Sequence, residues 1–259
     1  MASQGLLGDA IYLQLFPRAA YSAKDPAQWH TLGVTLERQQ GVHAIASDRR
    51  TDFDTFPGVL AQTPIGVDVF SESAEGGEYL LLRFDESFAC QHLPRIDRRV
   101  QSAGHSHALQ LAREMRRVLL APQPDRFALE QGALAFVDLA CSSGEAPQRI
   151  TSKAFNQVLD QIKAQFHQPL RLEQLAATYG HNELRFLRDF TRAIGLTPHA
   201  YLIETRLQAA RRLIEHTDWP LASIALEAGF SHQSHMGSAF RQHLAMTPSQ
   251  YRLRCKLQQ

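Results

Sequence analysis

The side chains with the clearest capacity for chemistry are arginines and amides near the C-terminus, spaced for one face of a helix. Arg185 is followed by Arg188 and Arg192, and the last two are four residues apart, so they share a helix face. A guanidinium can donate two hydrogen bonds to guanine in the major groove of DNA, or it can bind a backbone phosphate. Farther along, the amide of Gln233 can pair with adenine. This spacing predicts contact with DNA.

A pair of short helices that occurs twice in the chain must position these side chains. The two copies run from Leu172 to Pro198 and from Leu221 to Pro248, and each ends in Thr-Pro. Alanines and a glycine near the turn of each copy suit the close crossing of one helix over the next. Because repetition within one chain is hard to obtain by chance, the pattern predicts two helix-turn-helix units.

Local signals set the expected ends of these helices. Asn182 is a good N-cap for a helix that Gly195 stops, and Pro198 suits the first turn of a long connecting helix over 199–216. Ser231 is expected to cap the second helix of the second copy.

The apolar residues of the two DNA-facing helices lie four apart, as they should on an inward face. Phe186 and Phe190 point inward in the first, and Met236 and Phe240 do so in the second. The outward positions of the second helix are Gln233, Ser234, Gly237 and Ser238. Glycine also costs a helix about 1 kcal/mol relative to alanine. We therefore expect the first helix to supply most of the sequence discrimination.

The net charge of +1 conceals an asymmetry between the two halves. Residues 149–259 hold 14 lysines and arginines against 8 acidic residues, whereas residues 1–148 hold 13 against 18. A basic C-terminal part beside an acidic N-terminal part indicates that one half meets a polyanion. Arg211 and Arg212, on the connecting helix, are expected to be solvated charges.

The composition excludes several classes of protein. No run reaches the ~18 apolar residues of a membrane span, and the N-terminus lacks the basic start and cleavage site of a secretory signal. The 3 cysteines show no CxxC spacing, which argues against a disulfide scaffold or a zinc ribbon. A reducing cytoplasm and no membrane partner are expected.

The N-terminal half has the texture of a β-rich domain followed by helices. Short apolar runs separated by Gly and Pro turns fill residues ~10–86. They are Ile11–Phe16, Leu32–Arg38, Val42–Ser47, Val67–Ser71 and Glu78–Phe84. Such strands predict a β-sandwich or small barrel, and residues ~105–141 read as two helices. The expected organisation is a domain over 1–141, a linker over 142–150 and a helical domain over 151–259.

The C-terminal ~100 residues resemble the AraC/XylS family of bacterial transcription regulators. The resemblance rests on the stretch GFSHQSHMGSAFRQHLAMTPSQYR and continues through FLRDFTRAIGLTPHAYL and RLQAARRLI. It implies an α+β two-domain protein. The N-terminal domain would be a cupin-like β-barrel or sandwich with a helical dimerisation segment. The C-terminal domain would be all-α, with two helix-turn-helix subdomains joined by a linker helix.

The same resemblance implies a function and a set of partners. The protein would be a sequence-specific transcription regulator of the bacterial nucleoid, and activation is favoured. Its partners would be double-stranded DNA, RNA polymerase, a small-molecule effector and a second copy of the chain. The resemblance implies neither enzymatic activity nor a cofactor.

The resemblance also places the residues that read bases. They fall on Leu184, Leu187, Arg188, Gln233, Ser234, Gly237 and Ser238. From the residues themselves, Arg192 and Arg241 are expected to be phosphate contacts or surface residues, not base readers. The chain departs from the family pattern at Ser238, where Arg is common, at Gly237, where Ser or Thr is usual, and at Ala245, where Gly is usual. These departures suggest that the second helix mainly grips phosphate.

The N-terminal domain offers candidates for an effector site. Residues with both reach and chemistry are Tyr12, Trp29, Arg38, His43, Phe53, Phe56 and Arg83. An arginine inside a barrel would favour an anionic ligand. The His-x-His pair, His105 and His107, follows the strands, and His43 stands alone, so no metal site is predicted.

Two other functions stay open from the residues alone. A constitutive DNA-binding or architectural protein would share the helix pairs but would bind DNA regardless of any small molecule. An enzyme with a DNA-targeting module, as in some alkylation-repair proteins, needs an activated cysteine. Cys90 and Cys141 lack a cysteine cluster or a Pro-Cys-His setting, and no Ser or Cys has His and acid partners at a known motif spacing.

Overall fold

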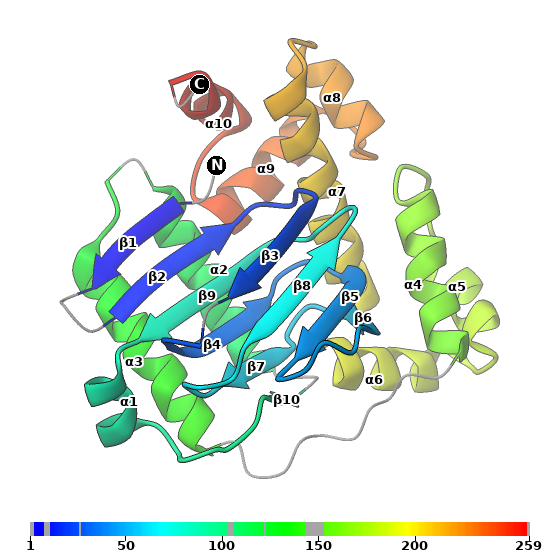
Figure 1. Ribbon diagram of the computed structural model, residues 1–259. Helices are drawn as coiled ribbons and strands as arrows, with labels where there is room; N and C mark the ends of the chain where they lie inside the picture. The colour runs from blue at the N-terminus through cyan, green and yellow to red at the C-terminus, as the bar shows by residue number, and fades with distance from the viewer. Residues whose placement is uncertain are drawn as a thin grey trace. The chain divides into compact units, whose positions relative to one another are not determined.

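The computed structural model describes residues 3–7, 11–25, 27–102, 106–121, 123–142 and 153–257. The chain forms two compact units, Met1–Gln148 and Arg149–Gln259 (Figure 1). The first combines β-sheets with helices and the second is helical, which is the α+β two-domain class that the sequence predicted. The predicted linker, 142–150, lies outside the described residues except for its first position.

Two antiparallel sheets build the N-terminal domain. In spatial order, the six-stranded sheet contains β1 (Ser3–Leu7), β2 (Ile11–Phe16), β9 (Tyr79–Phe84), β4 (His30–Thr35), β7 (Leu60–Thr63) and β10 (Val100–Ser102). In the same way, the four-stranded sheet contains β3 (Tyr21–Asp25), β8 (Val69–Ser73), β5 (Gln39–Ile45) and β6 (Thr51–Thr55). The five predicted apolar runs all form strands; β2 has the predicted ends and the other four have shifted ends. The strands β1, β3, β6, β7 and β10 and the short helix α1 (Glu86–His92) were not predicted.

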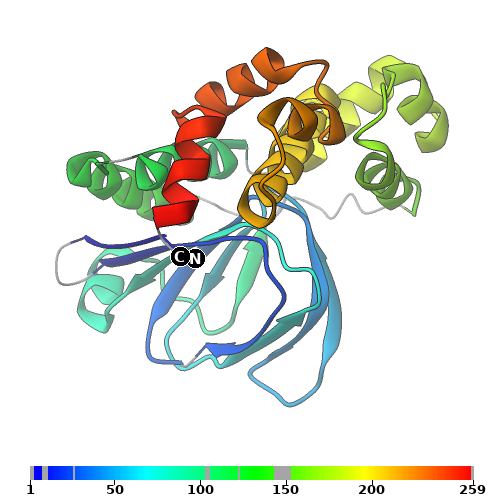
Figure 2. The ribbon, with the colours of Figure 1, turned by 90° about the horizontal axis from the view of Figure 1, so that it is seen from above.

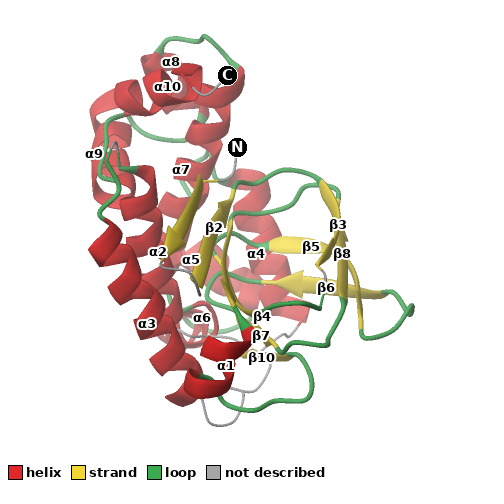
Figure 3. Cartoon of the chain, turned by 60° about the vertical axis from the view of Figure 1, so that its left-hand side comes forward, coloured by secondary structure: helices red, strands yellow, loops and turns green. Residues whose placement is uncertain are grey.

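The apolar core of this domain lies on one face of the six-stranded sheet. Leu82 pairs with Leu13 on β2 and with Leu32 on β4, and all three side chains are fully buried. The helices α2 (Ser106–Leu120) and α3 (Arg126–Ser142) pack together, and both contact this sheet (Figure 3). The sheet therefore buries one face against helices, as the alternating pattern of β2 requires.

The C-terminal domain is a doubled helix-turn-helix. Its elements are α4 (Lys153–Gln165), α5 (Leu172–Tyr179), α6 (Glu183–Ile194), α7 (Pro198–His216), α8 (Leu221–Glu227), α9 (Gln233–Leu244) and α10 (Pro248–Leu257). Figure 2 shows α7 between the yellow-green helices of the first subdomain, α4 to α6, and the orange-red helices of the second, α8 to α10. In the described parts of the chain, no helix is both long and apolar enough to cross a bilayer.

The predicted helix ends of the first copy are confirmed. The side chain of Asn182 accepts a hydrogen bond from the backbone N of Arg185 at 2.9 Å. Gly195 ends α6 in the left-handed conformation with φ 76°. Thr197 then caps α7 through a 3.2 Å bond from the backbone N of Ala200. These contacts satisfy amide and carbonyl groups that helix ends otherwise leave unpaired.

The predicted cap of α9 was wrong by one residue. The N-cap is His232, whose Nδ1 accepts from the backbone N of His235 at 3.1 Å. The hydroxyl of Ser231 lies 3.1 Å from the ring Nδ1 of His235 and takes no part in the cap. Propensity favours serine at this position, but the turn places the imidazole of His232 over the free amides.

The C-cap of α9 is strained where the first copy is not. Ala245 occupies the left-handed region with φ 56°, and a side chain there is unfavourable by about 1–2 kcal/mol. Because glycine also gains freedom in the unfolded chain, we expect Ala245→Gly to raise the free energy of unfolding of the C-terminal domain by only about 0.5–1 kcal/mol. Urea denaturation followed by circular dichroism would measure it.

The matched control is the equivalent cap of the first copy. Gly195→Ala should destabilise the domain by a similar amount, since Gly195 has φ 76°. If Ala245→Gly left the midpoint unchanged or lowered it, the left-handed conformation of this residue would not hold in solution.

Candidate nucleic-acid interface

One face of α6 is buried and the other is open, so the helix can present side chains to a ligand. Phe186, Phe190 and Ile194 are fully buried. Phe190 packs against Phe155 and Tyr201, with ring centroids 5.6 and 5.7 Å away. This aromatic cluster fixes the rotation of α6 about its axis.

The outward face of α6 carries the predicted DNA-reading residues. Leu184 is 69% exposed, Leu187 is half-buried, and Arg185, Arg188 and Arg192 are exposed. The exposed Leu184 side chain lies beside the exposed arginines on the same helix. An apolar side chain at this place can contact the methyl group of thymine.

The three arginines of α6 differ in their freedom. Arg185 lies 3.7 Å from Asp189, and Tyr179 donates to the same carboxylate at 3.2 Å. Burial, and then the Asp189 carboxylate, raises the pKa of the Tyr179 phenol. Arg188 and Arg192 form no ion pair with any residue that the structure describes. Their guanidinium groups are the ones available to bases or phosphates.

On α9 the predicted residues divide into two groups. Gln233, Ser234 and Ser238 are exposed, whereas Gly237 faces the same side but is covered. The side chain that covers it is Arg241, whose guanidinium lies 3.6 Å from where a Cβ on Gly237 would stand. The hydroxyl of Ser238 accepts from Arg241 at 3.3 Å and donates to the carbonyl of Ser234 at 3.1 Å. Arg241 itself remains exposed.

Several basic side chains lie near the start of α9. His235 contacts Phe230 edge to face at 5.2 Å. Burial lowers the pKa of His235, and the nearby His232, Arg206 and His199 lower it further. The ring is therefore held neutral more strongly in the folded domain than in the unfolded chain.

This shift predicts a loss of stability in acid. The folded state binds the proton less readily than the unfolded state, so stability is complete above the ordinary pKa of 6.5. It falls as the pH drops through the folded value. We expect the Tm of the C-terminal domain to fall between about pH 7 and 5 and to fall less in His235→Gln. The fluorescence of Trp219 in a Trp29→Phe background would measure the Tm at each pH.

The control is His216→Gln, at an exposed histidine, whose Tm should fall with pH as much as that of the parent. A smaller fall in Tm in this variant, equal to that in His235→Gln, would contradict the assignment to His235.

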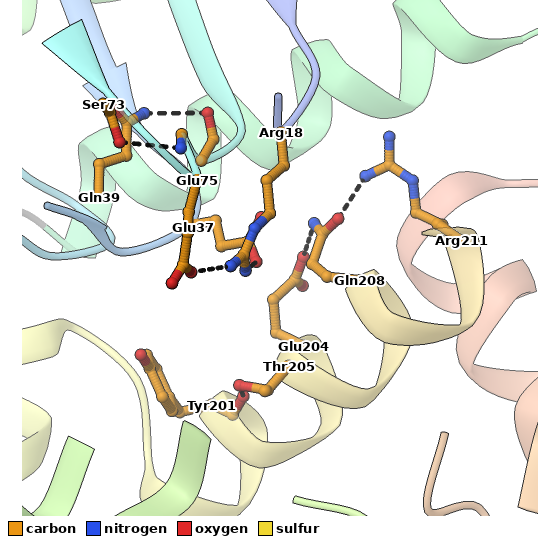
Figure 4. Close-up of polar contacts among 12 residues, drawn as sticks. Arg18, Glu37, Gln39, Ser73, Glu75, Tyr201, Glu204, Thr205, Gln208 and Arg211 are labelled. Carbon is orange, nitrogen blue, oxygen red and sulfur yellow. Dashed lines mark hydrogen bonds and ion pairs between the residues drawn. The ribbon is translucent and has the colours of Figure 1, made fainter. Parts of the chain in front are cut away.

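The connecting helix α7 carries a buried polar network, and the expectation that Arg211 is solvated was wrong. Arg211 is 6% exposed; it donates to Tyr251 at 3.1 Å and to Gln208 at 2.9 Å. Gln208 in turn donates to Glu204 at 3.0 Å (Figure 4). Tyr251 also bonds Glu215, and burial raises the pKa of its phenol. The network ties α7 to α10, which stiffens the connection between the two subdomains.

In the N-terminal domain, the arginines predicted to hold an anion are already neutralised. Arg38 donates to both carboxylate oxygens of Asp54, at 2.8 and 2.6 Å, and lies over the ring of Phe56. Arg83 donates to Gln14 at 2.9 Å and to Asp25 at 3.4 Å. Neither guanidinium is therefore an open site for an anionic ligand.

The other effector candidates do not form one group. Tyr12 is paired with Arg83 in the ladder between β2 and β9. His43 stacks on Phe53 with ring centroids 5.3 Å apart, on the four-stranded sheet. Phe56 is buried in the turn before β7, and Trp29 is half-buried before β4.

A partly buried polar cluster that was not predicted surrounds Tyr79. Burial raises the pKa of its phenol, while Arg99 beside it lowers that pKa. Arg99 also donates to Thr63 at 2.6 Å, and its Nε is buried without a hydrogen-bond partner in the described structure. The ring of Tyr79 lies across Gly33, where a Cβ would come within 1.7 Å of the phenol oxygen. A glycine inside an apolar strand was the available signal.

No chemistry of another kind is evident in the described structure. Within the described ranges, no three His, Cys, Asp or Glu side chains gather to hold a metal ion. The position of His105 lies outside those ranges. The three cysteines are free thiols.

The family model that matches the chain covers part of its C-terminal half. A family described as a helix-turn-helix domain matches residues 175–254. An uncharacterised HTH-type transcriptional regulator of Staphylococcus aureus (strain COL) is 35% identical over 97 residues, covering 38% of this chain and 13% of that protein. One of Haemophilus influenzae is 32% identical over 103 residues, covering 40% of this chain and 35% of that protein. The chain thus spans only a minor part of these relatives.

A solved structure is also similar to part of the chain. A probable AraC family transcriptional regulator from Rhodopseudomonas palustris is 30% identical, with a TM-score of 0.37, covering 40% of this chain and 98% of that one. The matched family is one of helix-turn-helix domains, as the doubled helix pair predicted. The C-terminal part of this chain, residues 175–254, belongs to the helix-turn-helix DNA-binding domains of the AraC family.

Proposed function

We propose that this chain is a sequence-specific transcription regulator that activates its target genes in response to a small molecule. The observation that carries the proposal is the outward face of α6, where Arg188 and Arg192 are exposed and lack ion-pair partners in the described structure. Buried Phe186 and Phe190 hold that face in one orientation. A rigid, basic, unpaired helix face is what reading of the major groove requires.

The two recognition helices have different tasks in this proposal. On α6, Leu184, Leu187 and Arg188 read base edges, while Arg185 and Arg192 hold phosphates. On α9 the side chains that face outward are short or engaged with one another, as the bonds of Ser238 illustrate. Gln233 is the base reader there, and Ser234, Ser238 and Arg241 serve the phosphate backbone.

The effector would bind between the two sheets of the N-terminal domain, which spans 1–141 in this proposal. Arg83 on β9 bonds Asp25 on β3, so the inner faces of the two sheets meet there. These faces are polar, in contrast to the leucine-rich face under α2 and α3. Arg99 forms no ion pair with any described carboxylate, and its Nε has no partner. An anionic effector would therefore bind at Arg99 and Tyr79.

Dimerisation and activation complete the proposal. On α3, Phe127 is 67% exposed and Leu134, two turns later, is 50% exposed. Two such apolar residues on one helix face suit contact with a second copy of the chain. The active dimer would recruit RNA polymerase on the nucleoid in the bacterial cytoplasm.

The test is selection of DNA from a random library by the full-length chain at two salt concentrations. The proposal expects an enriched motif with two elements about one helical turn apart, bound with steep salt dependence. Enrichment of no motif, with binding that depends on salt alone, would contradict sequence-specific regulation.

The second candidate is a constitutive or architectural DNA-binding protein. The observation in its favour is the weak reading face of α9, where Gly237 is buried and Ser238 is engaged by Arg241. That candidate predicts weak sequence preference and DNA affinity that no small molecule changes. Repeating the selection with a panel of small carboxylates would separate the two functions.

A further inference from the structure

Three segments of the C-terminal domain meet at one point that belongs to neither recognition helix. They are the end of α4, the middle of α7 and the turn that precedes α9. Arg206 on α7 donates from Nε to the carbonyl of Phe166 at 2.8 Å and from Nη2 to the carbonyl of Gln168 at 2.9 Å. Both acceptors follow α4 in the first subdomain.

The guanidinium of Arg206 is partly buried and faces the negative end of a helix. Burial lowers the pKa of its guanidinium. The two carbonyls that accept from it lie just past the C-terminus of α4, where the helix dipole is negative. A guanidinium bridges two such carbonyls with a planar, pre-organised set of N–H donors, whereas an ammonium presents its donors on a flexible stem.

Gly229 brings the second subdomain to the same point. It lies in the turn between α8 and α9 with φ 82°, a conformation that disfavours any side chain. A Cβ on Gly229 would stand 2.6 Å from the carbonyl of Phe166, 2.8 Å from Cα of His167 and 2.9 Å from Nε of Arg206. The backbone of the second subdomain therefore packs directly against the backbone of the first.

We propose that Arg206 and Gly229 form an inter-subdomain latch that sets the distance and angle between the two recognition helices. The inference rests on the proposed function, because it concerns how the two helices are held for DNA. The latch contacts no base. Arg206 acts as a positioning residue through the ends of α4 and α9.

The physical consequence is a fixed spacing of DNA elements. Two binding modules that are rigidly linked gain affinity only for sites at the matching separation. The buried network around Arg211 stiffens α7 and ties it to α10. The latch adds the contact that joins the first subdomain to the turn before α9. Loss of the latch should therefore relax the spacing and should leave recognition of each element intact.

The experiment is selection from a random DNA library with full-length parent protein, Arg206→Ala, Arg206→Lys and Gly229→Ala. Sequencing gives the distribution of spacings between the two elements. We expect a narrow distribution for the parent and a broad one for Arg206→Ala and Gly229→Ala. Affinity for the two-element site should fall about tenfold, with no change on a duplex that carries the first element alone. Arg206→Lys keeps the charge, so its spacing distribution and its affinity should lie between those of the parent and of Arg206→Ala.

The controls separate the latch from charge and from folding. Lys163→Ala removes an exposed positive charge from α4 and should keep the narrow spacing. Gly229→Ala changes no charge, so a broadened spacing there is geometric. If circular dichroism shows that Gly229→Ala does not fold, the latch is tested by comparing the spacing distributions of Arg206→Lys and Arg206→Ala.

Two results would overturn the latch, and they differ. A parent with a two-element motif whose variants keep the same narrow spacing would refute the latch and leave the proposed function standing. A parent that enriches no two-element motif would refute the proposed function, and the latch with it.

Discussion

Replacing Arg116 alone with methionine should lower the free energy of unfolding of the N-terminal domain by about 3–5 kcal/mol. Arg116 on α2 lies 2.7 Å from Glu78, which precedes β9, and both side chains are 0% exposed. Removal of Arg116 takes a charge-assisted hydrogen bond from a fully buried carboxylate, and breaking a buried ion pair on one side is strongly destabilising. Urea denaturation followed by Trp29 fluorescence in a Trp219→Phe background isolates this domain.

The double variant tests whether the pair or the charge is responsible. Arg116→Met combined with Glu78→Met replaces a buried ion pair by apolar side chains of similar length. Its stability should return close to that of the parent or exceed it. The matched control is the exposed pair of Arg126 and Glu130, 3.1 Å apart on α3, where Arg126→Met should cost less than about 1 kcal/mol. A loss below about 1 kcal/mol in Arg116→Met would contradict a buried ion pair.

The place of this pair gives it meaning beyond stability. The backbone carbonyl of Glu78 accepts from the amides of Leu36 and Glu37 at 2.9 and 3.2 Å. Arg116 therefore fastens α2 to the junction between β9 and the end of β4. An effector bound at Tyr79 would contact β9 at the residue next to Glu78, and Glu78 is bonded to Arg116 of α2. This is a short route from the sheets to the helical pair.

The doubled helix-turn-helix was predictable because its signals are local. Asn182 and Gly195 mark helix ends through bonds to residues within four positions, and propensity captures such contacts. Phe186 and Phe190 are spaced for one helix face, and periodicity captures that as well. The AraC-type domain is therefore recognisable from its amino-acid sequence alone.

The errors arose where the partner is distant in sequence. Arg211 looked like a surface charge, yet its partner Tyr251 lies 40 residues away. Arg38 and Arg83 looked like open cations, and their carboxylate partners, Asp54 and Asp25, stand on other strands. Side-chain pairing across a fold leaves no periodic trace in a single sequence.

The strands were predicted unevenly for the same reason. β2 and β9 are apolar runs whose pattern identifies them. β3 and β6 are short, polar and mostly exposed or half-buried, and pairing with neighbouring strands makes them strands. Strand propensity is a weak guide for such segments, because packing against neighbours decides their conformation.

Replacing Arg188 with alanine should reduce affinity for the selected DNA motif by about 10- to 100-fold, which corresponds to about 1–3 kcal/mol. Arg188 is exposed on the outward face of α6 and has no ion-pair partner in the described structure. A bidentate contact to guanine is lost in full, because alanine reaches neither O6 nor N7. Binding of the full-length variant to the selected duplex, by fluorescence anisotropy, gives the ratio.

The matched comparison is Arg192→Ala, four residues along the same face, where the proposal places a phosphate contact. That variant should weaken binding to all duplexes alike and reduce the salt slope by about 1. Arg188→Ala should instead relax the preference at one base position and leave the affinity for a scrambled duplex almost unchanged. If both variants lost affinity equally on the motif and on the scrambled duplex, Arg188 would be a phosphate contact. Base reading by α6 would then rest on Leu184 and Leu187, and the protein would read fewer bases than the helix face allows.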